Sequence, residues 1–234
     1  MLRGRSPRFD CGVRSLARVL GRLGIDGEHA HRGGGVSSCA TCDGFLYRDQ
    51  QVLVVGGGDT AMEEALVLAR TSSSVTLVHR GAKFRASHAL ASRVLSHSKI
   101  KVRYHTTVSR FGGDSAGRLT HAMLSTSDGG GGGAGARRTE SRIDVAAAFI
   151  AIGHQPNTAM LRGSVRLRPD GYVDMADSGR TARTSCAGIF AAGDVADPYY
   201  RQAVTSAGSG ATAALDAERW LSEGAGGDAS PCLA

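Results

Sequence analysis

A short apolar run that ends in three glycines constrains the fold of this chain more than any other feature. Val52–Val55 form the run, and Gly56–Ala61 follow it with the sequence Gly-Gly-Gly-Asp-Thr-Ala. Such a run is typical of a buried parallel strand. The residues from Thr60 to Arg70 have a helical apolar pattern, and a second apolar run follows at Val75–Val78. Strand, turn, helix and strand in this order predict a βαβ unit with a right-handed crossover.

The glycine turn is typical of a site that binds a dinucleotide pyrophosphate at a helix N-terminus. Gly56 permits the tight turn, Gly58 lets the backbone approach the pyrophosphate, and Ala61 keeps helix and strand close together. The alternative is an ordinary turn of an α/β protein, but the flanking strand and helix favour the nucleotide site. The expected contact residues are Gly56, Gly57, Gly58, Asp59, Thr60 and Ala61.

The residues after the second apolar run indicate which nucleotide binds. An acid about 20 residues past the first glycine usually binds the ribose 2′-hydroxyl of NAD. Here the sequence has His79 and Arg80 near this position, with Lys83 and Arg85 close behind. Arginine and lysine attract the 2′-phosphate of NADPH, which an acid would repel. The cluster therefore favours NADPH over NADH, the alternative being a solvated basic loop.

Two cysteines with C-x-x-C spacing, Cys39 and Cys42, lie ahead of the first strand and are followed directly by Asp43. This spacing allows a small disulfide and lowers the pKa of one thiol. The alternatives are two buried small hydrophobic residues or half of a zinc site. No other cysteine pair or His-x-x-x-His pair accompanies them, so the redox interpretation is favoured and no metal is expected. Asp43 is either an acid–base group for a thiolate or a turn residue.

Composition disfavours two classes of partner. The chain of 234 residues carries a net charge of +7, which suits nucleic acid, a phosphorylated cofactor or an acidic protein. Aromatic residues make up 5% of the chain and do not alternate with basic ones, so nucleic-acid binding is not expected. No segment approaches the ~18 apolar residues of a membrane span, so no membrane crossing is expected.

The cysteine count and the first residues bear on the cellular location. Five cysteines are a small odd number, which fits one C-x-x-C pair in the reducing cytoplasm better than a secreted disulfide framework. The first 25 residues contain six arginines and one acid, Asp10. This start is either a transit peptide for a chloroplast or mitochondrion or a region of no structural importance. Cys11, Cys186 and Cys232 receive no role.

The rest of the chain gives a coarser pattern. We expect a helix at Phe84–Ser96, a strand at Lys101–Val108, and an antiparallel excursion on either side of the glycine run at 129–133. A strand at 146–152 is expected to return to the same sheet. A strand at Gly188–Asp194 and a long helix at Ala203–Leu221 follow.

These segments together resemble the low-molecular-weight NADPH-dependent thioredoxin reductases. The resemblance runs from about Leu23 to about Leu221. Its motifs occur in the family's order at residues 35–44, 56–61, 79–86, 151–158, 191–195 and 200–208.

The resemblance implies a thioredoxin-disulfide reductase that passes electrons from NADPH through FAD to Cys39–Cys42 and on to thioredoxin. Cys42 is implied to face the flavin, Cys39 to attack thioredoxin, and Asp43 to be the acid–base group. Arg80 and Arg85 are implied to bind the 2′-phosphate, with His79 beside them. Family members are homodimers. The other implied cofactor contacts are Ile152, Gly153, Gly193, Asp194, Val195, Arg201, Gln202 and Ala203.

Two departures from the family are visible. The family usually has a second arginine directly after the position of Arg80, where this chain has Gly81. The family also begins with a flavin-binding half that carries its own glycine turn, and nothing before Cys39 resembles it. We therefore expect the isolated polypeptide to bind FAD poorly. The alternative to a reductase is a truncated, non-catalytic NADPH-binding module.

The expected architecture is α/β: a Rossmann-like three-layer NAD(P)-binding domain joined to the C-terminal remainder of an FAD-binding domain. The predicted boundaries are a leader of unclear structure at 1–22, the NADPH-binding domain with the redox cysteines at 23–153, the FAD-domain part at 154–223 and a tail at 224–234.

Overall fold

The computed structural model describes residues 19–127, 137–177 and 179–223. The chain divides into two compact units: the sheet unit, Leu20–His154, and the α4 unit, which comprises Met1–Val19 and Gln155–Ala234. Most of the predicted leader, the glycine run at 129–133 and the tail from Gly224 lie outside the described residues. None of the described helices is long and apolar enough to cross a membrane.

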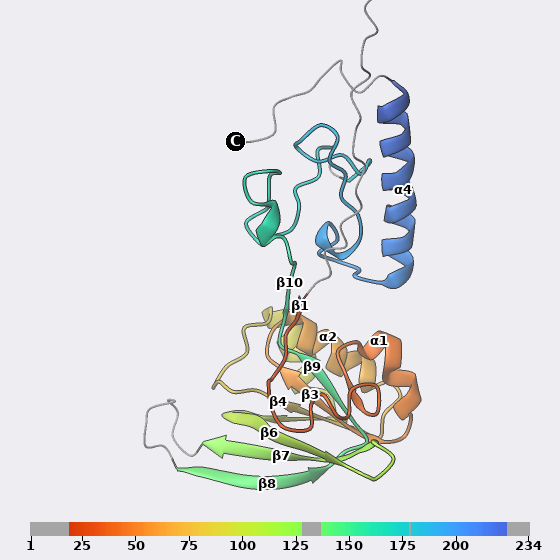
Figure 1. The fold of residues 1–234 in the computed structure, drawn as a ribbon. Helices are drawn as coiled ribbons and strands as arrows, with labels where there is room; N and C mark the ends of the chain where they lie inside the picture. Colours follow the sequence, from red (N-terminus) through yellow and green to blue (C-terminus); the bar gives the residue numbers. More distant parts are fainter. Residues whose placement is uncertain (1–18, 128–136, 178, 224–234) are drawn as a thin grey trace, which may run out of the picture. The chain divides into compact units, whose positions relative to one another are not determined.

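A five-stranded parallel sheet forms the centre of the sheet unit (Figure 1). Its order is β2-β9-β3-β4-β5, and every neighbouring pair is parallel. The predicted βαβ unit is therefore present, with α2 (Asp59–Leu68) joining β3 to β4. The strands are β2 (Val36–Ser37), β3 (Gln51–Gly56), β4 (Ser74–Val78), β5 (Ile100–Arg103) and β9 (Ala147–Ala151).

Alternate residues of β3 face two different apolar cores. Val52 and Val54 pack with Met62 and Leu68 of α2 on the helical face of the sheet. Leu53 and Val55 belong to the core on the opposite face. Because the side chains on both faces of β3 are buried, the run Val52–Val55 is apolar at every position. The helical layer also contains α1 (Ala40–Asp43), the 3-10 turn η1 (Gly44–Tyr47) and α3 (His88–Leu95).

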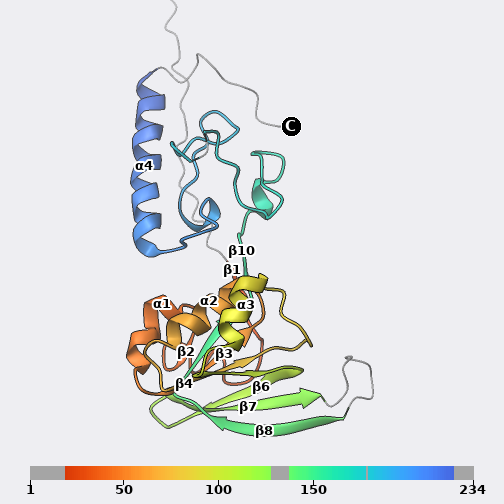
Figure 2. The ribbon, with the colours of Figure 1, turned by 180° about the vertical axis from the view of Figure 1, so that it is seen from behind.

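A three-stranded antiparallel sheet covers the other face of the parallel sheet (Figure 2). Its order is β6-β7-β8, and Val108, Phe111 and Leu124 are among the residues it contributes to the shared core. Helices, parallel sheet and antiparallel sheet make three layers, which confirms the predicted Rossmann-like α/β architecture. The strands are β6 (Thr106–Gly113), β7 (Leu119–Ser127) and β8 (Arg138–Asp144).

The α4 unit contains little regular structure besides α4 (Ala203–Ser222). A small apolar cluster forms around Val165, Val173 and Cys186. Of the 20 residues of α4, Asp216 is the buried one. The short elements η2 (Ala159–Leu161) and η3 (Gly193–Val195) complete this unit, and the two-residue strands β1 (Val19–Leu20) and β10 (His154–Gln155) pair with each other.

The structure differs from the predicted elements in three places. The single strand predicted at Lys101–Val108 is two strands, because the chain turns at His105, whose φ is +50°. The helix predicted from Phe84 begins only at His88. The segment Gly188–Asp194 is not a strand. Phe190 forms an isolated bridge with Arg183, and the described part of the unit has no continuous neighbouring strand to satisfy the other backbone groups.

Candidate redox and nucleotide site

The predicted site segments of the sheet unit gather at one edge of the parallel sheet. Ser37 and Val54 both pair in register with Phe149, and Gly56 pairs with Ala151. Because the strands are parallel, the residues that follow them leave the sheet at the same, carboxyl edge, where α/β proteins bind ligands. The segments brought to this edge are Cys39–Asp43, Gly56–Ala61, His79–Arg85 and Ile152–Gly153.

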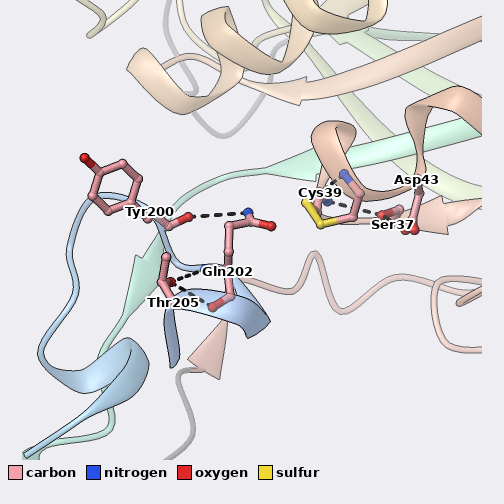
Figure 3. Close-up of a disulfide and its surroundings, with 7 residues drawn as sticks. Ser37, Cys39, Asp43, Tyr200, Gln202 and Thr205 are labelled. Atoms are coloured by element: carbon pink, nitrogen blue, oxygen red, sulfur yellow. Dashed lines mark hydrogen bonds between the residues drawn. A yellow bond between two sulfur atoms is a disulfide. The ribbon is translucent and has the colours of Figure 1, made fainter. Parts of the chain in front are cut away.

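Cys39 and Cys42 form a disulfide, with their Cα atoms 5.3 Å apart (Figure 3). Cys39 is the N-cap of α1, and its Sγ accepts a hydrogen bond of 3.1 Å from the backbone N–H of Cys42. Cys42 is exposed and Cys39 is partly buried. Sulfur atoms that are bonded to each other favour the redox interpretation over a zinc half-site or two inert hydrophobic residues.

Asp43 is the last residue of α1 and directly follows Cys42 in the chain. Its Oδ2 accepts a hydrogen bond of 2.6 Å from the hydroxyl of Ser37 (Figure 3). The same hydroxyl oxygen accepts a hydrogen bond of 3.2 Å from the backbone N–H of Cys39. Burial raises the pKa of Tyr47, and the negative charge of Asp43 raises it further. The side chain of Asp43 is therefore held within the redox segment by Ser37, a residue to which the sequence assigns no role.

The three glycines of the turn differ in how much space surrounds them. A Cβ on Gly56 would lie 2.3 Å from the carbonyl oxygen of Ala151 and 2.7 Å from Cβ of Ala61. A Cβ on Gly57 would lie 2.2 Å from Nδ1 of His79. A Cβ on Gly58, the N-cap of α2, would meet no atom within 4 Å. Gly56 and Gly57 thus serve packing, whereas the space above Gly58 is open for a phosphate that approaches the helix N-terminus.

The loop after β4 is attached to the glycine turn by backbone hydrogen bonds. The N–H of Arg85 donates to the carbonyl of Gly57 at 2.7 Å. The N–H of Ser87 donates to Oδ1 of Asp59 at 2.7 Å. Ser87, the N-cap of α3, has an extended backbone with a ψ of 145°, so α3 begins at His88, later than the sequence predicts. The bonds to the glycine turn also place the predicted basic residues next to the predicted phosphate turn.

The buried ring of His79 packs against the loop that follows β4. Its Nε2 lies 2.9 Å from the carbonyl oxygen of Lys83. Its ring packs on Phe84 and Tyr104, with centroids 5.4 Å and 6.4 Å away. Arg80, Lys83 and Arg85 are exposed around it. The sequence predicts His79 among the cofactor contacts, and the burial of its ring against Gly57 is a feature that sequence spacing does not reveal.

In the α4 unit, two predicted flavin segments are joined by hydrogen bonds. The hydroxyl of Ser206 on α4 donates to Oδ1 of Asp194 at 3.2 Å, and the N–H of Gly193 donates to the hydroxyl of Ser209 at 3.0 Å. These bonds hold η3 against the first turns of α4. Gln202, the N-cap of α4, forms a capping box with Thr205 (Figure 3).

Asp197 organises the loop between these two segments. Its carboxylate accepts backbone N–H bonds of 2.9 Å from Tyr199, Tyr200 and Arg201. Burial raises the pKa of Asp197, but these hydrogen bonds outweigh burial and hold the pKa below its ordinary value. Arg201 has a φ of +54°, which the hydrogen-bonded loop maintains.

Comparison with known proteins places these features in a family. Residues 17–210 match the model of the pyridine nucleotide-disulphide oxidoreductases. The chain is 48% identical over 211 residues to a thioredoxin reductase of Mycolicibacterium smegmatis, covering 90% of this chain and 64% of the relative. It is 45% identical over 227 residues to a glucosaminate ammonia-lyase of Pseudomonas fluorescens, covering 94% of this chain and 68% of the relative.

A solved thioredoxin reductase from Giardia duodenalis superimposes with a TM-score of 0.77 at 38% identity, covering 88% of this chain and 63% of that one. This chain thus spans less than two thirds of the length of that structure and of the Mycolicibacterium relative. The match nevertheless extends into both compact units and includes the redox segment, the glycine turn and the first turns of α4. The chain belongs to the pyridine nucleotide-disulphide oxidoreductase family.

Proposed function

We propose that this chain carries the NADPH-binding and redox part of a thioredoxin-disulfide reductase. The observation that carries the proposal is the Cys39–Cys42 disulfide, which lies at the same sheet edge as the glycine turn. A dithiol that cycles with its disulfide moves two electrons, as does a nicotinamide. This pair also favours reductase chemistry over the lyase activity named for one relative.

The residues of the sheet unit fit NADPH. Gly58 and the N-terminus of α2 offer backbone N–H groups and open space to the pyrophosphate. Arg80 and Arg85 are exposed on the loop that is bonded to the turn, where their charges can pair with the 2′-phosphate. Lys83, on the same loop, supplies a further charge in place of the arginine that Gly81 replaces. We assign residues 23–153 to NADPH binding.

The α4 unit fits the C-terminal part of a flavin site. Asp194 of η3 accepts a hydrogen bond from Ser206 of α4. Gln202 is the N-cap of α4, and the Asp197 carboxylate binds the backbone of the loop that leads from η3 to this N-terminus. Bound FAD supplies two-electron transfer between the nicotinamide and the disulfide. The contacts assigned to it are Gly193, Asp194, Val195, Arg201, Gln202 and Ala203, within the domain part 154–223.

The disulfide chemistry uses residues of this chain. Reduction of the Cys39–Cys42 bond adds two electrons and two protons and yields two thiols. The Cys39 thiolate then attacks the disulfide of thioredoxin, and one thioredoxin sulfur leaves and takes a proton. The Cys42 thiolate displaces the second sulfur and the Cys39–Cys42 bond re-forms. Asp43 exchanges the protons of these steps.

The partner in this proposal is oxidised thioredoxin, and the complete enzyme is a homodimer. The reaction belongs in a reducing compartment, the cytoplasm, where dithiols are kept reduced. An organelle is the alternative location if the arginine-rich leader is a transit peptide.

A second candidate function is a non-catalytic NADPH-binding module. The exposure of α4 favours it, because Val204 is 78% and Leu215 56% exposed on a helix that buries Asp216. Apolar surface of this kind normally packs against further protein. A chain that lacks such a partner is expected to bind NADPH without retaining FAD.

The visible spectrum of the purified protein separates the two functions. A reductase binds added FAD, bleaches with NADPH and then reduces oxidised thioredoxin. In Cys39→Ser and Cys42→Ser variants, turnover is expected to disappear while NADPH binding persists. Turnover in either serine variant would reject the redox assignment. NADPH binding without bleaching would establish the non-catalytic module instead.

A further inference from the structure

We propose that Ser37 is a positioning residue for the redox pair: its hydroxyl holds the Asp43 carboxylate in place for proton exchange with the cysteine sulfur atoms. The inference rests on the proposed dithiol chemistry of Cys39 and Cys42. It concerns a hydrogen bond within the sheet unit and requires neither the α4 unit nor a bound cofactor.

The backbone of Ser37 is fixed by the sheet. Ser37 is the last residue of β2 and pairs in register with Phe149 of β9. Its neighbour Val36 is buried in the core between the two sheets. The hydroxyl of Ser37 therefore starts from a rigid element, unlike the side chains of the following loop.

The hydroxyl joins both ends of α1. It accepts the N–H of Cys39, the N-cap, and donates to Oδ2 of Asp43, the last residue of the helix (Figure 3). A helix of four residues is too short to be stable alone. The 2.6 Å bond to a carboxylate is of the short, charge-assisted type, which is stronger than a bond between neutral groups. One side chain thus fixes both the cysteine backbone and the acid–base group.

The consequence for the chemistry follows from the need for aligned proton transfer. When the reduced pair attacks a disulfide, a carbon-bound sulfur of the acceptor leaves and must gain a proton, and the attacking thiol must lose one. Without the Ser37 hydroxyl, the Asp43 carboxylate rotates freely about its side-chain torsions. It is then aligned for proton transfer with a sulfur atom for a smaller fraction of the time. Loss of the Ser37 hydroxyl is therefore expected to slow exchange without removing any reacting group.

The test is the exchange rate of the chemically reduced chain with an alkyl disulfide. Thiols are generated with a reductant that is then removed, hydroxyethyl disulfide is added, and re-formation of Cys39–Cys42 is followed by quenched alkylation and mass spectrometry. Ser37→Thr and Ser37→Val form a matched pair, since both side chains are β-branched and differ in the hydroxyl. Valine is expected to slow exchange about tenfold or more, and threonine to stay close to the parent.

Ser38 is the control, because in the described part of the chain its side chain makes no hydrogen bond; Ser38→Ala should leave the rate unchanged. Asp43→Asn supplies the second arm. If Ser37 acts through Asp43, Ser37→Val should cause no further loss in the Asp43→Asn background.

A parental rate in Ser37→Val, or an undiminished effect of valine in the Asp43→Asn background, would overturn the proposal. Equal slowing by threonine and valine would do the same. Because the assay contains neither NADPH nor FAD, its result is independent of whether the chain reduces thioredoxin with NADPH.

Discussion

Adjacent glycines of the phosphate turn are predicted to respond in opposite ways to the same substitution. In Gly57→Ala the new methyl group lies 2.2 Å from Nδ1 and 2.4 Å from Cε1 of His79. The ring cannot move away freely, because it is buried and its Nε2 contacts the carbonyl of Lys83 at 2.9 Å. In Gly58→Ala the methyl group meets no protein atom within 4 Å, and the φ of −100° suits any residue.

The magnitudes follow from packing and chain entropy. Inserting a methyl group into a filled site costs about 1–3 kcal/mol. Replacing glycine by alanine recovers about 0.4–1 kcal/mol by restricting the unfolded chain. For Gly57→Ala the two terms combine to a loss of about 0–2.6 kcal/mol of unfolding free energy, and the contact of 2.2 Å with a buried ring places the expected loss at about 1–2 kcal/mol. Gly58→Ala should leave the free energy of unfolding unchanged or raise it by up to about 1 kcal/mol.

Gly58→Ala should weaken NADPH binding although it does not lower stability, because the methyl group occupies the space through which the pyrophosphate approaches the backbone. We expect its NADPH dissociation constant to rise about tenfold or more, or about 1.4 kcal/mol. Urea unfolding followed by circular dichroism measures stability, and NADPH fluorescence measures binding. The double variant Gly57→Ala/His79→Ala is the steric control: Gly57→Ala should cost little in the His79→Ala background.

Two results would refute this reasoning. Equal stability of Gly57→Ala and the parent would show that the His79 ring does not fill the space beneath the turn. If Gly58→Ala bound NADPH as tightly as the parent, the pyrophosphate would not bind at this turn, and the proposed nucleotide site would be wrong.

Other predictions concern single side chains. Arg85→Ala should weaken NADPH binding about tenfold by titration and leave NADH binding unchanged, because only NADPH carries the 2′-phosphate. Asp216→Ala should lower the unfolding free energy in thermal denaturation by about 1–3 kcal/mol, because buried Asp216 accepts the N–H of Ala182 at 2.7 Å. Hydrogen bonds hold the pKa of Asp197 in the folded state below its unfolded value, so its stabilisation is present above the unfolded pKa and is lost as pH falls through the lowered folded pKa. Asp197→Asn should therefore show a smaller loss of stability in acid.

The parts of the fold that the sequence predicts are those determined by local pattern. The run Val52–Val55 is apolar at every position because both faces of β3 are buried, and this alone indicates a central parallel strand. The start of α3 is not predictable in this way, because Ser87 is extended where the loop is hydrogen-bonded to the glycine turn, nearly 30 residues earlier in the chain. The turn at His105 likewise follows from packing, since its residues carry no strong turn signal.

The candidate site shows the same division. The C-x-x-C spacing and the resemblance to thioredoxin reductases identify Cys39 and Cys42 directly. Ser37 was not identified, because its role depends on α1 folding back so that Asp43 reaches β2. The burial of His79 was missed for a similar reason, since the ring is covered by a turn more than twenty residues earlier in the chain. Residues that support a site through tertiary contacts have no sequence spacing of their own.

The decisive measurement is the redox state of Cys39 and Cys42 after anaerobic incubation with excess NADPH. Alkylation and peptide mass spectrometry of flavin-replete protein report the two thiols separately from Cys11, Cys186 and Cys232. Both cysteines should become alkylated in the presence of NADPH and stay disulfide-bonded without it. A disulfide that remains intact in flavin-replete protein under excess NADPH would show that electrons from NADPH do not reach Cys39 and Cys42.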